Sequence, residues 1–417
     1  MASVWTVRGM PALIGVTITG FAGYGALLPT TPLYAVEGGA SEAGAGLVNG
    51  VLLLFTVLTQ LFIPGLLKRF GWGSVMTGGM LLMGLSALGN MASDALWPIL
   101  ILSAIRGVGF GVLTVTGSAA VAELVEPARR GAAIGAYGLS IALPNLIFLP
   151  LAPWAAQTWG FPLVFVIAAL PLAGIPSVWA LARVLDAPNE DEKVAAPGVD
   201  GELDARESGD PGSAETRATN PRLAEEPMSG RTAYLRLLRP TFLLLAVTLA
   251  GGALLTFAPQ MVDSGVASTA ALFGTGATAA LARWRMGGLS DRFGAQPFMW
   301  PLTVLTVLGM GLAAFSVLGD VETTTSLVLF VVAACIVGVS YGGLQNLTLV
   351  VAFEAVTREH YRRASAVWNV GFDLGSGMGS VLVGLLATGF GFGPALFVAA
   401  AVSLCTLPLA ILRTRVR

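Results

Sequence analysis

Charged side chains are scarce in this chain of 417 residues, where Asp, Glu, Lys and Arg make up only 11% of the composition. Soluble domains carry about 25% charged residues, so this composition, with 55% hydrophobic residues, excludes a water-soluble globular protein. The formal net charge is −1, and the chain therefore lacks the basic excess with which proteins bind nucleic acid phosphates. We expect the lipid bilayer, and not nucleic acid, to be its partner.

The residue types that build metal and cofactor sites are also few. The only histidine is His360, and the two cysteines, Cys335 and Cys405, stand apart in apolar runs. That pattern predicts neither a disulfide nor a zinc or haem site. Neither lysine, Lys68 nor Lys193, follows a glycine, so no phosphate-binding loop for ATP is present. We expect no metal and no cofactor, and a transmembrane gradient as the energy source.

Two short patterns resemble enzyme motifs, but their context excludes both readings. Residues 338–342 spell G-x-S-x-G, a turn that must follow a strand, whereas here the pattern lies inside a long apolar run. His360 is twenty residues further on, about 30 Å along a helix. Residues 274–279 match a dinucleotide-binding pattern without a surrounding βαβ unit. The sequence therefore predicts a protein that is not an enzyme.

Long apolar runs are abundant. A helix that crosses the hydrocarbon core of a bilayer needs about 20 apolar residues. The chain contains twelve such stretches, and the first is too long for a signal peptide and is expected to be retained. The predicted spans are residues 10–34, 43–65, 74–93, 96–122, 131–154, 161–183, 241–262, 266–288, 297–318, 325–353, 363–388 and 391–412.

The charges between these spans alternate in sign. Every second loop, and both ends of the chain, carry Lys or Arg, whereas the intervening loops carry only acids. Because Lys and Arg collect in cytoplasmic loops, the pattern predicts a multi-pass protein of the plasma (inner) membrane with cytoplasmic N- and C-termini. The basic positions are Arg8, Lys68, Arg69, Arg129, Arg130, Arg285, Arg292, Arg358, Arg362, Arg363, Arg413, Arg415 and Arg417.

The two halves of the chain repeat one another. Residues 25–28 read Gly-Ala-Leu-Leu, and the same four residues recur at 252–255, while Arg-Phe-Gly occurs at 69–71 and again at 292–294. Such offsets indicate a parallel duplication of a six-helix unit. We therefore divide the chain into a six-helix bundle at 1–183, a linker at 184–240 and a second bundle at 241–417. The linker holds twelve of the 24 acids and almost no aromatic residues, a composition typical of disorder.

Three motifs carry a resemblance to a known family. Residues 287–294, Gly-Gly-Leu-Ser-Asp-Arg-Phe-Gly, are similar to the loop signature of the major facilitator superfamily. Residues 106–111 resemble the arginine-containing motif of its proton-coupled members, and residues 369–379 resemble a segment of bacterial efflux permeases. The resemblance implies an all-α membrane protein, with twelve transmembrane helices in two pseudo-symmetric six-helix bundles that rock about a central site.

The same resemblance suggests a gate on the cytoplasmic side. Asp291 and Arg292 occupy the acidic and basic positions of the loop signature, and we expect Asp291 to pair with Arg129 or Arg130 at the start of the fifth span. The alternative is a surface ion pair that only fixes the loop. In the first-half copy of the signature, Lys68 stands where the family has its acid.

Two charged residues fall near mid-depth in the predicted spans. Arg106 lies about 14 Å from the outer end of its helix, and Asp373 lies about 15 Å from the inner end of its helix. A charge at that depth costs about 2.5–3.5 kcal/mol or more, and such residues usually face a cavity on an ion or substrate pathway. We expect Asp373 to exchange protons and Arg106 to organise water or an anionic group. The alternative is that each only bonds neighbouring helices. Arg283, nearer the cytoplasmic end of its span, is expected to extend its head to the interface.

The family geometry places the first, fourth, seventh and tenth helices around the cleft. Those helices and their neighbours offer a few polar groups among many apolar ones, which suits an amphipathic organic solute better than a sugar. The expected lining residues are Tyr24, Tyr137, Asn145, Thr256, Gln260, Tyr341, Gln345, Asn346 and Asn369.

The sequence thus predicts a secondary transporter, and we expect proton-coupled export (antiport) of a small amphipathic organic compound by alternating access. The direction of transport follows from the resemblance alone. The alternative is proton-linked uptake of a small organic solute by the same fold, and a receptor or scaffold without transport is a third reading. We expect the protein to act as a monomer.

Overall fold

The computed structural model describes residues 7–125, 130–186, 229–319, 323–357 and 360–412, and every element in that part of the chain is a helix. Twelve helical spans there are long and apolar enough to cross a membrane, which confirms the predicted number. The elements are α1 (Met10–Glu37), α2 (Glu42–Gln60), α3 (Ile63–Gly89), the 3₁₀ turn η2 (Asn90–Ala92), α4 (Leu96–Leu124), α5 (Arg130–Trp159), α6 (Phe161–Ala168), α7 (Leu170–Ala173), α8 (Ile175–Leu185), α10 (Gly230–Met261), α11 (Gly265–Phe293), α12 (Gln296–Ser316), α13 (Thr324–Glu354), α14 (Tyr361–Phe390), α15 (Phe392–Cys405) and α16 (Leu407–Ile411).

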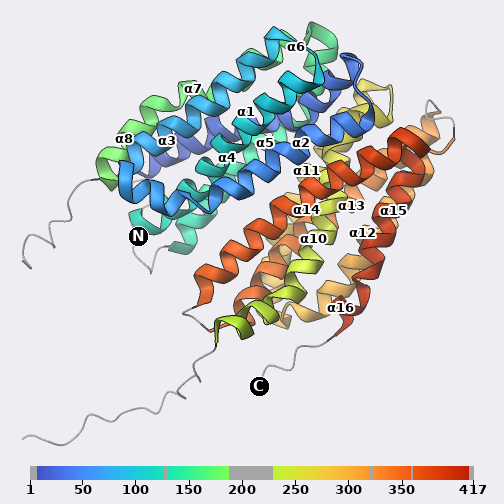
Figure 1. Cartoon of the computed structure of the whole chain (residues 1–417). Helices are drawn as coiled ribbons and strands as arrows, with labels where there is room; N and C mark the ends of the chain where they lie inside the picture. The colour runs from blue at the N-terminus through green and yellow to red at the C-terminus, as the bar shows by residue number, and fades with distance from the viewer. Residues whose placement is uncertain (1–6, 126–129, 187–228, 320–322, 358–359, 413–417) are drawn as a thin grey trace, which may run out of the picture.

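The helices form two bundles that lie side by side (Figure 1). The first bundle contains α1 to α8 and the second α10 to α16, with the N and C labels at the same end of the molecule. Termini on one side are what an even number of spans requires. The most buried spans are α1 and α10, which open the two halves and occupy equivalent places.

Helix ends differ from the predicted ones where capping or proline decides them. Helix α10 begins at Gly230, ahead of the predicted start at 241, because the Ser229 hydroxyl accepts a hydrogen bond from the Thr232 amide and caps the first turn. The sixth span is divided into α6, α7 and α8, since each of these segments has a proline in its first turn.

Four glycines in turns between adjacent spans share a conformation with positive φ and ψ of 154–170°. Gly39, between α1 and α2, also has a positive φ, 89°. Gly71 and Gly294 have φ of 74° and 78°, and Gly160 and Gly391 have φ of 93° and 78°. L-residues with a Cβ rarely adopt this conformation. Gly71 interrupts α3, so the second and third spans join there and not at the end of α2. The recurrence of this turn twice in each half agrees with halves that are each built from two three-helix units.

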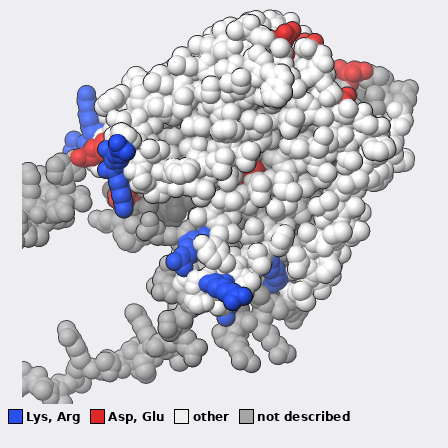
Figure 2. Space-filling view, in the orientation of Figure 1, with Lys and Arg blue, Asp and Glu red and all other residues white. Residues whose placement is uncertain are grey.

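Charge is distributed unevenly over the surface. In the space-filling view, Lys and Arg side chains lie at the left and along the bottom, with acidic side chains beside them at the left, and other acidic side chains gather at the upper right (Figure 2). The broad band between these ends shows only a small acidic spot. The band corresponds to the apolar spans, and the chain is an integral membrane protein. Most of the predicted linker, and the predicted basic positions Arg129, Arg358, Arg413, Arg415 and Arg417, lie outside the described residues.

Candidate functional site

The two bundles meet along a seam between α2 and α14. At one end of the seam, the Ala43 amide donates to the Thr388 hydroxyl at 2.9 Å. Further along, Gly46 lies against the Ser380 carbonyl, and Gly377 lies against Leu53. Glycines at these points let the two backbones approach closely.

The seam ends at Asp373, which lies on α14 and is only 6% exposed. Its Oδ2 accepts a hydrogen bond of 2.8 Å from Nε2 of Gln60, the last residue of α2. The same amide nitrogen lies 3.3 Å from the Thr114 hydroxyl on α4. The one acid in the middle of a described span is therefore the polar link between the two bundles at the inner end of the seam.

Contacts between the two bundles show which end of the molecule is closed. A second set of contacts, between α5 and α11, includes the hydrogen bond from Thr269 to the Pro150 carbonyl and the approach of Gly265 to Gln157. Both sets run from mid-helix to the end that carries the acidic loops. At the opposite, basic end, Asn369 and Arg283 have solvent access. The described conformation is thus closed at the acidic end and open toward the basic end.

Tyr24 lies beside Asp373 in the first bundle. Its ring stacks on Phe110, with centroids 3.9 Å apart and planes 3° apart. Tyr24 interacts electrostatically with Asp373, Arg106 and Tyr341, so these four predicted residues from α1, α4, α13 and α14 form one cluster. We call Tyr24, Arg106, Tyr341 and Asp373 the central cluster.

Arg106 is almost completely enclosed, at 2% exposure. Its Nη1 donates to the Thr31 hydroxyl at 3.1 Å, whereas Nε and Nη2 have no hydrogen-bond partner within the described chain. A buried guanidinium with unused donors is costly. Two of the three guanidinium nitrogens of Arg106 therefore have no described partner in this conformation.

The second bundle contributes Tyr341 and Gln345 from α13. The Tyr341 ring packs on Gly251 of α10, where a Cβ would not fit, and Ser376 and Gln345 lie beside it. The Gln345 side chain is 2% exposed, and neither of its polar atoms has a hydrogen-bond partner in the part of the chain that the structure describes. Asn346, the next residue, donates to the Arg283 carbonyl at 3.0 Å.

Other predicted lining residues lie away from this cluster or are already hydrogen-bonded. The Thr256 hydroxyl bonds Asn49, Ser380 and the Gly252 carbonyl and so belongs to the contact between the halves. The Tyr137 hydroxyl lies against Gly117 of α4, and Asn369 donates to the Ser365 carbonyl of its own helix.

Two further lining residues keep unused polar atoms. Both side-chain polar atoms of Gln260 and the Oδ1 atom of Asn145 have no partner in the described part of the chain. Asn145 lies against Gly25 of α1. The structure thus places Tyr24 and Tyr341 near Asp373 and Gln345 beside Tyr341. The substrate-binding roles of all nine predicted lining residues stay predictions.

The predicted gate is only partly described. Asp291 is exposed on the last turn of α11 and makes no ion pair with any described residue. Arg292 lies with its Cζ 5.7 Å from the centroid of the Phe293 ring. Arg129 lies outside the described residues, and the structure gives no side-chain position for Arg130. The pairing of Asp291 with these arginines therefore stays a prediction.

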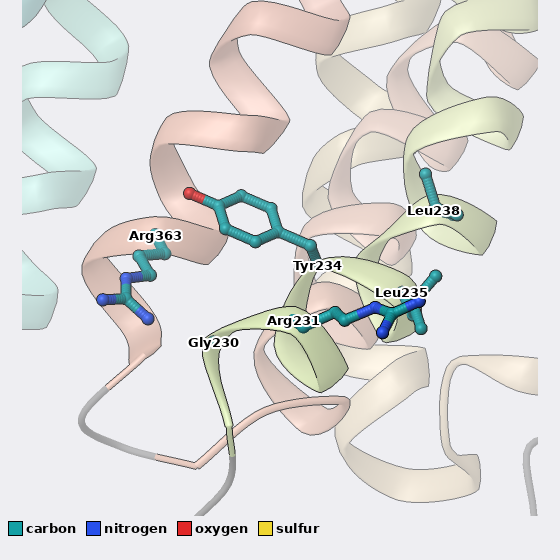
Figure 3. Close-up of a pocket in the computed structure, with 6 residues that line it drawn as sticks. All are labelled: Gly230, Arg231, Tyr234, Leu235, Leu238 and Arg363. Carbon is teal, nitrogen blue, oxygen red and sulfur yellow. The ribbon is translucent and has the colours of Figure 1, made fainter.

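A surface groove lies at the basic end, where α10 and α14 begin (Figure 3). It has a volume of about 570 Å³, and its lining residues are Gly230, Arg231, Tyr234, Leu235, Leu238 and Arg363. None of these belongs to the central cluster or to the predicted lining set. Within the described residues, no three His, Cys, Asp or Glu side chains come together in a way that could hold a metal ion.

Sequence reasoning missed Gln60 and misjudged Arg283. Gln60 is 313 residues from Asp373 in the chain, and nothing in a single sequence signals that pairing. Arg283 does not extend to the membrane interface as predicted, because it lies beside Tyr341 with protein atoms crowded around its guanidinium group.

Comparisons with known proteins agree with this architecture. The family model described as Major Facilitator Superfamily matches residues 13–316 and 263–417. Uncharacterized MFS-type transporters of Burkholderia mallei (strain SAVP1) and Burkholderia pseudomallei (strain 668) are each 30% identical over 180 residues, and the match covers 41% of this chain and 41% of theirs. The chain thus matches less than half the length of these curated relatives.

Solved structures of similar fold are more distant in sequence. A bacterial homolog of the human lysosomal transporter Spinster, inward-facing and unoccupied, has a TM-score of 0.66 at 15% identity, with 99% of this chain and 95% of that one covered. A POT family transporter in complex with 5-aminolevulinic acid has a TM-score of 0.72 at 13% identity, with 96% and 95% covered. The nucleoside transporter NupG has a TM-score of 0.67 at 11% identity, with 97% and 99% covered. These likenesses show the fold.

Proposed function

The chain belongs to the major facilitator superfamily, and from that premise we propose that it is a secondary transporter of a small amphipathic organic compound, coupled to protons through Asp373. Its two bundles rock about the central cluster, so that the cleft opens to each side of the membrane in turn. The described conformation, closed at the acidic end and open at the basic end, is one of the two states that such a cycle requires.

The hydrogen bond between Asp373 and Gln60 is the observation that carries the proposal. The amide donates to a carboxylate oxygen, and protonation of the carboxyl group turns this charge-assisted hydrogen bond into a weaker neutral one. It therefore weakens the only described polar link at the inner end of the seam. Proton loading then loosens the contact between α2 and α14, and proton release restores it. Protonation of Asp373 and closure of the seam are coupled because both depend on the hydrogen bond between Asp373 and Gln60.

The direction of transport has two candidates. Export by exchange of protons for solute is favoured by the similarity of residues 369–379 to a segment of efflux permeases. Uptake together with protons is favoured by a different observation, the presence of Arg106 and Arg283 near a single acid, because cations next to a protonated acid favour an anionic solute. In both cases Asp373 is the proton site and Arg106 holds the adjacent charge.

Proton flux in proteoliposomes tests the coupling. Wild-type protein should release or take up protons when solute moves, and Asp373→Asn should remove that proton movement, because the amide cannot be protonated and deprotonated in this range. Exchange gives proton movement opposite to solute, and uptake gives proton movement with solute. If Asp373→Asn keeps full gradient-driven flux, the proton site is elsewhere, and a receptor or scaffold would show no flux in either protein.

The charge distribution supports the placement in the cell. With the basic end toward the cytoplasm, both termini are cytoplasmic, as the distribution of Lys and Arg between loops favours. We propose a monomer of the plasma (inner) membrane with bundles at 1–183 and 241–417 and a cytoplasmic linker at 184–240. The gate residues Asp291, Arg292, Arg129 and Arg130 then lie on the cytoplasmic side, where they can latch the closed cytoplasmic face.

A further inference from the structure

Arg283 and Arg285 lie on opposite faces of α11, although only one residue separates them. A helix turns 100° per residue, so the two side chains point about 200° apart. Arg285 lies over the ring of Trp284, with its Cζ 5.1 Å from the centroid, and Trp284 is 70% exposed on the outer surface. Arg283 lies inside, near enough to Tyr341 to interact with it electrostatically.

Arg283 has no counter-ion in the described chain. Its side chain makes no hydrogen bond or ion pair with a described residue, although it has solvent access and protein atoms crowd around it. That combination is what a side chain lining a cleft shows. The amide of Gln345, which lies beside the same Tyr341, is buried, and neither of its polar atoms has a partner among the described residues.

The charges around the cleft do not balance. Arg283 and Arg106 are two cations that stay charged, and Asp373 is the one acid in the middle of the described spans. The groups that face Asp373 from the other helices are Gln60, Tyr24 and Tyr341, and none of them is an anion at neutral pH. At least one positive charge is left uncompensated, and a protonated Asp373 adds to the excess.

We infer that the transported solute is an amphipathic organic acid whose carboxylate is bound by Arg283. The planar guanidinium matches a carboxylate with two parallel hydrogen bonds. Gln345 and Tyr341 supply further donors at the same place, and Leu, Val and Phe side chains of the cleft receive the apolar part of the solute. The inference rests on the proposed transport function and names its substrate class.

One electrostatic consequence follows for coupling. A carboxylate in the cleft repels ionised Asp373 and is attracted when that acid is protonated. Proton and solute therefore favour each other's binding, and by linkage the effect is mutual. An organic acid thus travels together with the proton, which favours uptake over exchange.

Thermal stability of the purified full-length protein in detergent tests the substrate class. The probes are 4-phenylbutyrate, 4-phenylbutyramide and 4-phenylbutylamine, which share an apolar skeleton and differ in charge. A ligand that binds only the folded state raises the Tm. The acid should raise the Tm of the wild-type protein, and the amide and the amine should not. Stabilisation by the amine, or by none of the three, would overturn the inference.

Variants assign the binding to Arg283. Arg283→Gln should need at least about tenfold more acid for the same Tm shift, because a charge-assisted pair is lost. Arg283→Lys keeps the positive charge but not the planar guanidinium, so the acid concentration that it needs should lie between those of the wild type and Arg283→Gln. Arg285→Gln is the matched control and should need the same acid concentration as the wild type. Equal stabilisation of wild type and Arg283→Gln by the acid would contradict the assignment, and the Tm without probe reports whether each variant is folded.

The same assay separates this inference from the proton site. If the acid stabilises the protein through Arg283 while Asp373→Asn keeps its proton flux, the substrate class stands and the coupling residue is wrong. If Asp373→Asn loses proton flux but the acid has no effect on Tm, the coupling stands and the substrate class is wrong.

Discussion

Asp373 and Gln60 are the pair of residues on which the proposed coupling depends. The carboxyl group is buried at mid-helix, and its described hydrogen bond is the 2.8 Å contact to the Gln60 amide. A buried polar group that loses its partner costs about 1–3 kcal/mol, and more when it is charged. At the residue scale, one amide therefore sets how stable the closed inner end of the seam is.

Gln60→Leu should weaken the seam without removing the acid. We expect solute-driven proton flux to fall at least about fivefold, which corresponds to the 1 kcal/mol lower limit for a lost buried bond. Thr114→Val is the matched control, since it removes the longer, 3.3 Å contact to the same amide and a hydrogen bond to the Gly111 carbonyl within α4 but leaves the bond to Asp373. It should leave flux within about twofold of wild type. Flux in Gln60→Leu equal to that of wild type would show that this bond has no part in coupling.

For single residues, the sequence predicts the depth in the membrane but not the direction in which the side chain points. The position of Asp373 within an apolar run predicted burial, because charge is rare there. The partner, the stacking of Tyr24 on Phe110 and the inward direction of Arg283 depend on contacts between helices that are far apart in the chain. Periodicity places a residue on a helix face, but which face meets which neighbour is decided by packing.

Helix α14 carries glycines on two different faces, one toward α2 and one toward α10. Gly377 faces α2, whereas Gly371, Gly375 and Gly379 face Thr241, Thr248 and Leu249 of α10. The four-residue spacing of the latter three is typical of close helix packing, and these glycines do lie against α10. The sequence did not identify the face of α2 that contacts the other bundle. Gly46 and Gly50 lie on that face because they pack against Ser380 and Val381 of α14, and a single sequence does not predict those contacts.

Gly46→Leu should prevent closure at the acidic end. A Cβ at this position meets the Ser380 carbonyl, which cannot move without shifting α14. We expect reduced transport and greater labelling of a cysteine placed at Leu53 by a membrane-impermeant reagent added from the acidic side, in a background with Cys335 and Cys405 replaced by Ser. Gly78→Leu, with no atom within 4 Å of its Cβ position, is the control. Unchanged labelling in Gly46→Leu would mean that the seam does not close this side.

The molecule as a whole has two similar six-helix bundles, but the buried acid Asp373 occurs only in the second. The number of spans, the division into halves and the alternation of charge could be predicted because apolar length and the position of arginines are local properties of the chain. Helix ends such as Gly230 shifted because capping decided them. The relative position of the halves could not be predicted, since it depends on the seam.

Two separately expressed halves should assemble. Each half has its own buried apolar cluster, around Met299 and Leu302 in the second and around Phe21 and Met80 in the first. We expect segments 1–186 and 229–417, produced together in one cell, to copurify and to recover at least about half of the wild-type solute flux. Failure of the halves to copurify would contradict the proposed division into two self-contained bundles.

The imbalance of fixed charge in the cleft has a consequence for the membrane voltage. If one proton joins Asp373 and one carboxylate joins Arg283, the loaded cleft has the same charge as the empty one. The complete cycle is then electroneutral, so the voltage, which does about 2.3 kcal/mol of work per elementary charge per 100 mV, does no net work on it. Accumulation would follow the pH difference alone, whereas one-for-one exchange of a proton for an organic anion would move two charges and respond steeply to voltage.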